Sequence, residues 1–128
     1  MPRWSEYKKE AKERGSLAHE MYVVESTVAS APETVKANLA GHLKYQQALE
    51  ISGKLAFAGP LSDDSGELME GNGLLIYRAT SLEEARELAE NDPMHQSGAR
   101  SYRLRRWMIN EGSISLNVGL STASVSLG

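Results

Sequence analysis

His42 is the first residue whose place in the sequence suggests chemistry. It belongs to a helical stripe with spacings of four, three, four and three residues, made of Val35, Leu39, His42, Gln46 and Leu49. Because its apolar neighbours must face a core, the imidazole should point inward, toward a sheet. A core histidine bonded to a backbone carbonyl would explain this position. An acid or base in a semi-buried cleft would explain it equally well.

Asp92 is the second such residue, on a stripe of another expected helix with Leu82, Ala85 and Ala89. Asp followed by Pro93 is also an ordinary helix junction, in which the Asp caps the next turn and Pro takes its first position. If both helices pack on one face of a sheet, their inward side chains can converge. A carboxylate beside an imidazole orients it and stabilises its charged form. Spacing alone does not show that the two side chains meet.

Two further groups of residues are candidates for contact with a substrate. The segment 59–63 could form the rim of a cleft, in which Gly59, Pro60 and Ser62 contact the ligand. It could equally be a turn that only ends a strand. Tyr45 could line the same pocket or simply pack.

His95 follows Asp92 by three residues and is a further substrate-binding candidate. Together with His42 these residues could hold a metal, but three scattered ligands without a signature spacing are weak evidence for one. The glycines of segment 71–73 do not satisfy a phosphate-loop pattern. We therefore expect neither a metal nor a cofactor.

Composition narrows the possible functions. The 128 residues are 41% hydrophobic and 24% charged, which is typical of a soluble globular domain. The absence of Cys excludes thiolate nucleophiles, iron–sulfur clusters and disulfides, and with no apolar leader at the start it favours a cytoplasmic protein. The net charge of -3 gives no field that would recruit nucleic acid or an anionic membrane. Alternation divides Arg100, Arg103, Arg105 and Arg106 between two strand faces, so we expect an ion-paired surface rather than an RNA site.

Hydrophobic patterns predict the order strand, helix, strand, strand, helix, strand. The predicted elements are strand 21–24, helix 32–53 with Ser30 as its cap, strand 55–59 ended by Pro60, strand 73–79, a helix from the capping box 81–84 to Asp92, and strand 102–109. This order is the split βαβ or ferredoxin-like arrangement, an α+β fold with an antiparallel sheet. We expect a helical extension over residues 1–19, the ferredoxin-like domain over 20–111, and a β extension or tail over 112–128. Residues 113–120 alternate strictly and predict a half-buried strand at a sheet edge, with fraying beyond Ser121.

The two helices of this fold cover only one face of the sheet, yet the predicted strands are apolar on both faces. Something else must therefore cover the second face. A second copy of the chain is the favoured candidate, which predicts a homodimer or higher homo-oligomer. The alternative is that the N-terminal helix and the C-terminal tail cover this face within one chain.

Several motifs resemble the YCII-related (YciI-like) family. They are Gly41-His42-Leu43, Gly53-Lys54-Leu55 with segment 58–63, segment 81–85, and Asn91-Asp92-Pro93 with Gly98. The resemblance spans about residues 21 to 110 and implies a ferredoxin-like fold assembled as a dimeric α/β barrel. It also implies an active site built from a His–Asp pair, which maps onto His42 and Asp92. Leu39 departs from the family pattern, because many members carry Arg at that position.

One branch of that family is linked to dehydrochlorination of chlorinated hydroxyquinols, and the wider fold includes muconolactone isomerases and cofactor-free monooxygenases. We therefore expect a small-molecule enzyme of lyase, dehalogenase or isomerase type. Its substrate would be a small cyclic or ring-opened organic compound, with His42 as general acid or base and Asp92 orienting it. The alternatives are a non-catalytic dimeric module that binds a metabolite or a partner, and cofactor-free oxygenation.

Overall fold

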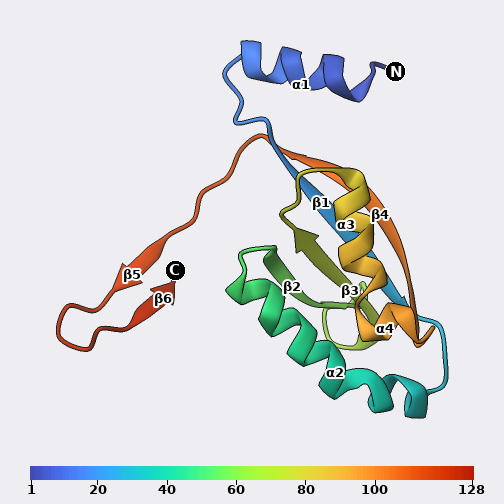
Figure 1. Cartoon of the computed structure of the whole chain (residues 1–128). Helices are drawn as coiled ribbons and strands as arrows, with labels where there is room; N and C mark the ends of the chain where they lie inside the picture. Colours follow the sequence, from blue (N-terminus) through green and yellow to red (C-terminus); the bar gives the residue numbers. More distant parts are fainter. The chain divides into compact units, whose positions relative to one another are not determined.

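A four-stranded sheet forms the centre of the larger part of the chain (Figure 1). The computed structural model describes all 128 residues, which divide into two compact units: Glu20–Trp107, and Met1–His19 together with Met108–Gly128. The strands are β1 (His19–Val28), β2 (Leu55–Ser62), β3 (Met69–Tyr77) and β4 (Arg100–Ile109), in the order β2-β3-β1-β4. Both β1 and β2 pair antiparallel with β3. This topology confirms the predicted ferredoxin-like α+β fold.

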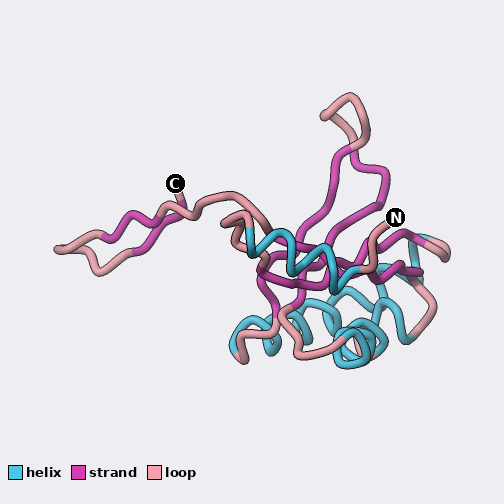
Figure 2. Tube along the Cα trace, turned by 90° about the horizontal axis from the view of Figure 1, so that it is seen from above, coloured by secondary structure: helices cyan, strands magenta, loops and turns pink.

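Three helices of the larger unit lie on one face of this sheet (Figure 2). They are α2 (Pro32–Ile51), α3 (Leu82–Glu90) and the short α4 (Pro93–Gln96). Helix α2 ends before Gly53, whose φ of 79° is one that L side chains rarely adopt. Helix α3 begins as the capping pattern predicts, because the Ser81 hydroxyl accepts a hydrogen bond from the backbone N–H of Glu84.

The core of the larger unit lies between the sheet and these helices. Alternate residues of the strands point into this core, and α3 contributes the small or apolar side chains of one of its faces. Its buried members are Tyr22, Val24, Leu49, Leu75, Tyr77, Ala85, Leu88 and Ala89. Because Leu49 is the only buried residue of the 20-residue helix α2, much of that helix is left beside open space.

Two local predictions are wrong. Strand β2 does not end at Pro60 but continues to Ser62, with Pro60 opposite Gly73. An edge strand tolerates proline, because one side of it has no ladder to complete. The cap of α2 is Ala31 rather than Ser30, whose hydroxyl instead donates to the Ala99 carbonyl at 3.0 Å.

The smaller unit contains the predicted N-terminal helix, α1 (Trp4–Glu13), and a C-terminal hairpin. Its small core consists of Ala11, Ala18 and Met108, with Tyr7 packed against them. The hairpin pairs β5 (Leu116–Val118) with β6 (Val125–Leu127), and every residue of both strands is exposed. Within this chain the two halves of the tail pair with each other, so fraying beyond Ser121 is wrong, while pairing at the sheet edge of a partner subunit stays a prediction.

Candidate active site

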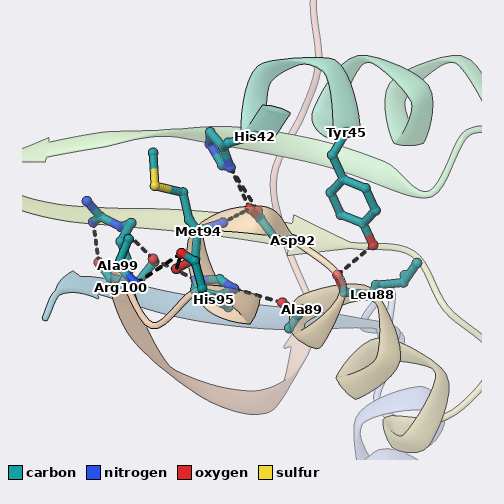
Figure 3. A network of polar contacts seen from close by, with 11 residues as sticks. His42, Tyr45, Leu88, Ala89, Asp92, Met94, His95, Ala99 and Arg100 are labelled. Atoms are coloured by element: carbon teal, nitrogen blue, oxygen red, sulfur yellow. Dashed lines mark hydrogen bonds and ion pairs between the residues drawn. The ribbon is translucent and has the colours of Figure 1, made fainter. Parts of the chain in front are cut away.

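His42 and Asp92 meet in this structure (Figure 3). The His42 Nδ1 atom lies 2.8 Å from Oδ1 and 2.9 Å from Oδ2 of Asp92. An ionised carboxylate can only accept, so Nδ1 is the donor and carries a proton. The ring nitrogen Nε2 has no partner in the protein and is the atom left for a ligand.

Asp92 is fixed by the junction between α3 and α4. It is the N-cap of α4, where its Oδ1 accepts from the backbone N–H of Met94 at 2.9 Å, and Pro93 takes the first helical position. Its side chain is completely buried. Both interpretations of Asp92 from the sequence therefore describe the structure, since one carboxylate caps a helix and also holds an imidazole.

Close packing of α2 on α4 brings the two residues together. At Gly41, the neighbour of His42, a Cβ would lie 3.5 Å from Cγ of Pro93, the neighbour of Asp92. Gly41 and the Pro93 ring thus lie in near contact, and the adjacent side chains of His42 and Asp92 face each other. The His42 side chain remains 16% exposed, whereas that of Asp92 is completely buried.

His42 also lines a cleft between α2 and strands β2 and β3, with a volume of about 410 Å³. This volume lies in the usual range for small-molecule sites. The walls are mostly apolar, and they include Val35, Leu39, Leu43, Ala58, Leu74, Leu75 and Met94. The arrangement therefore places one proton-carrying ring beside space suited to a small, partly apolar molecule.

The predicted substrate-binding residues do not all lie at this cleft. Gly59 and Pro60 line it, and the exposed Ser62 does not; its hydroxyl donates to the Asp63 carbonyl at 2.9 Å. Tyr45 also lies outside the cleft, with its hydroxyl donating to the Leu88 carbonyl at 2.7 Å. Burial, reinforced by the negative charge of Asp92, raises the pKa of Tyr45 to about 12.

His95 lies outside the cleft as well and is held by its own hydrogen bonds. Nδ1 donates to the Ala89 carbonyl at 2.8 Å, so in the neutral ring Nε2 accepts from the Ser26 hydroxyl, also at 2.8 Å. The ring packs against Tyr102 with centroids 4.7 Å apart. Burial lowers the pKa of His95, which favours this neutral form. No group of three or more His, Cys, Asp or Glu side chains is placed to hold a metal ion.

Ser26 and Arg100 line the cleft although neither is among the site residues predicted from the sequence. Arg100 was assigned to a surface patch, yet it shares the alternation of Tyr102 and Leu104, which face the helices. A signal was present: an arginine and a serine occupy core-facing positions on neighbouring strands β4 and β1. Polar side chains at such positions are costly unless they are paired, so each is a candidate for a site.

The architecture and the paired residues define an α+β domain of the ferredoxin-like class with a His–Asp pair beside an apolar cleft. The chain belongs to the YCII-related domain family, whose model matches residues 7–108. This confirms the resemblance read from the motifs. A curated relative, the uncharacterized protein YjpA of Bacillus subtilis (strain 168), is 31% identical over 74 residues, which are 58% of this chain and 80% of YjpA.

A solved structure is also similar to this chain. It is that of 5-chloro-2-hydroxyhydroquinone dehydrochlorinase (TftG) from Burkholderia phenoliruptrix AC1100, in complex with 2,5-dihydroxybenzoquinone. The similarity has a TM-score of 0.54 at 25% identity and covers 68% of this chain and 92% of TftG. In the present chain, no helix is long and apolar enough to cross a membrane.

Proposed function

We propose that this protein is a small-molecule enzyme in which His42 transfers a proton to or from a substrate bound in the cleft. The observation that carries the proposal is that the two nitrogens of one imidazole have different surroundings. Nδ1 of His42 is bonded to the fully buried carboxylate of Asp92. Nε2 has no partner, and His42 lines the cleft. Asp92 would fix the tautomer and stabilise the ring when it takes up a second proton.

The substrate class follows from the cleft and from the similarity to a dehydrochlorinase. Apolar walls around one acid–base group suit a small cyclic or ring-opened organic compound. The reaction would be of lyase, dehalogenase or isomerase type, because each of these can begin with removal of a proton by one base. The similarity to an enzyme solved with 2,5-dihydroxybenzoquinone supports a ring compound of comparable size.

We also propose that the protein works as a homodimer or higher homo-oligomer. Alternation along the strands places Phe57 and Trp107 on the sheet face away from α2 and α3, and they are 54% and 45% exposed. Exposed large apolar side chains on one face are typical of an interaction surface.

The direct test is His42→Ala assayed on 5-chloro-2-hydroxyhydroquinone and related chlorinated and unchlorinated hydroquinones, with chloride release and product spectra as readouts. A positioned acid–base group contributes about a hundredfold to ten-thousandfold in rate, and we expect a loss of that order. The matched control is His19→Ala, because His19 is exposed and does not line the cleft.

Full turnover by His42→Ala would end the proposal. If no compound is turned over but His42→Gln weakens binding, the protein is a non-catalytic binding module. Thermal melting of each variant shows whether the fold is intact.

A further inference from the structure

Arg100 reaches the cleft from β4, the edge strand on the far side of β1 from β3. Its Nε donates to the Ser26 hydroxyl at 2.8 Å, and its Nη2 donates to the Ser26 carbonyl at 2.9 Å. Nη2 also donates to the carbonyl of Gly71 on β3. The side chain therefore crosses β1 and is anchored on two strands, which holds its planar group in one orientation.

These contacts leave part of the guanidinium unused. The group carries five N–H donors, and the three contacts above use the one on Nε and both on Nη2. The two donors on Nη1 have no partner in the protein. Each of these N–H groups can donate a charge-assisted hydrogen bond to an oxygen of a carboxylate or a similar oxyanion.

The charge of Arg100 is also unbalanced in the cleft. No carboxylate forms an ion pair with it, and all its acceptors are uncharged oxygens. Among the residues that line the cleft, Arg100 is the only permanent charge, and none is acidic. Asp92 acts on Arg100 only through space, and a half-buried cation without an ion-paired carboxylate is costly, so a bound anion would offset part of that cost.

Gln46 adds a second polar group without a hydrogen-bond partner. It lies one helical turn after His42, lines the same cleft, and has a buried Oε1 without a hydrogen-bond partner. Buried acceptors are normally satisfied, and a ligand hydroxyl that reached this atom would supply the missing donor.

We propose that Arg100 binds the oxyanion of a small, hydroxylated, largely apolar anion and so presents it to His42. This inference rests on the proposed function, since it names the class of substrate for the same cleft. Figure 3 shows His42 and Arg100 approaching from α2 and β4, with Met94 between them in this view. Arg100 is thus a substrate-binding residue that determines specificity, and it is distinct from the proton-transferring pair.

The test compares two ligands of equal shape, 4-hydroxybenzoate and 4-hydroxybenzamide, by isothermal titration calorimetry on the full chain. We expect the wild type to bind the anion at least about tenfold more tightly than the amide, since a hydrogen bond to a charged group is stronger than one to a neutral group. Arg100→Gln should remove this preference. The amide measured on the same variant corrects for any general loosening of the cleft.

Arg103→Gln is the matched control. It removes the same charge from the same strand at a residue that is exposed and outside this cleft, so it should keep the preference for the anion. A second probe, 2,5-dihydroxybenzoquinone, is ionised at neutral pH and should bind the wild type and lose affinity in Arg100→Gln.

Equal affinity of the wild type for 4-hydroxybenzoate and 4-hydroxybenzamide would overturn the proposal. So would the absence of binding of either anion at millimolar concentration, or a preference that survives Arg100→Gln. These outcomes are independent of whether His42 transfers a proton, because binding selectivity does not require turnover. A chain that keeps the preference but never transfers a proton would refute the proposed function and leave the role of Arg100 intact.

Discussion

The Asp92 carboxylate caps α4 and also holds the His42 imidazole, and a single substitution separates these two roles. In Asp92→Asn the side-chain oxygen can still accept from the Met94 N–H, so α4 keeps its cap. The amide cannot accept on both of its atoms, so the His42 Nδ1 proton is no longer held as it is now. We expect kcat to fall by about a hundredfold or more while the fold persists.

The measurement is turnover of the best hydroquinone substrate together with thermal melting. Asp64→Asn is the control, because Asp64 is exposed and lies in the β2–β3 connection. An Asp92→Asn protein with unchanged kcat would show that the carboxylate only caps the helix.

His95 makes a different prediction, about stability and pH. Its pKa is lowered mainly by burial, so the unfolded chain takes up its proton more readily than the folded one. The neutral, bonded ring therefore contributes its stability above the unfolded value of about 6.5, and this contribution is lost as the pH falls through the lower folded value. We expect the free energy of unfolding to decrease with acidification below about pH 6.5.

Urea unfolding at pH 7.5, 6.5 and 5.5 measures this slope. His95→Gln cannot take up the proton, so it should be less stable at pH 7.5 and show a shallower loss over that interval. If wild type and His95→Gln lose stability in parallel, His95 is not the titrating group.

At the scale of elements, the approach of α2 to α4 decides whether the site assembles. Gly41 lies inside α2, where glycine costs about 0.5–1 kcal/mol relative to alanine. A Cβ there would meet Pro93 at 3.5 and 3.6 Å, which is ordinary van der Waals contact. We therefore expect Gly41→Ala to stabilise the protein by roughly 0.5 kcal/mol or more, as measured by chemical denaturation.

The paired control is Gly53→Ala, just past the end of the same helix. Its φ of 79° disfavours any side chain although nothing lies within 4 Å, so this substitution should destabilise by about 1 kcal/mol. Destabilisation by Gly41→Ala would mean that α2 and α4 cannot give way even slightly, and that the His42–Asp92 contact depends on the glycine.

Periodicity predicted the elements well, most clearly where β1 and α3 bury residues at regular spacing. It placed His42 and Asp92 on inward stripes, but their meeting depends on how α2 lies on α4, which is a tertiary property. The position of Arg100 in the cleft could not be predicted, for a related reason. Its side chain crosses a neighbouring strand, and no pattern along its own strand reports that.

At the scale of the whole molecule, the sheet face away from α2 and α3 carries the proposed contact between copies of the chain. The register places Phe57 beside Ile76 and Ile76 beside Val23, so an apolar row crosses three strands. Only a partner or another part of the chain can keep water from the exposed ring of Phe57. Because a symmetric dimer places such a row against its own copy, one changed residue alters both sides of the interface.

Phe57→Lys should therefore shift the protein toward the monomer. In sedimentation equilibrium we expect the wild type at twice the 14.0 kDa chain mass, or a higher multiple, and Phe57→Lys at or near one chain mass. Ala48→Lys adds the same charge to an exposed position of α2 and should leave the mass unchanged. A wild type that sediments as a monomer would show that this face is not a contact between copies. If only Ala48→Lys dissociates the oligomer, the contact lies on the helical face instead, beside the cleft that His42 and Arg100 line.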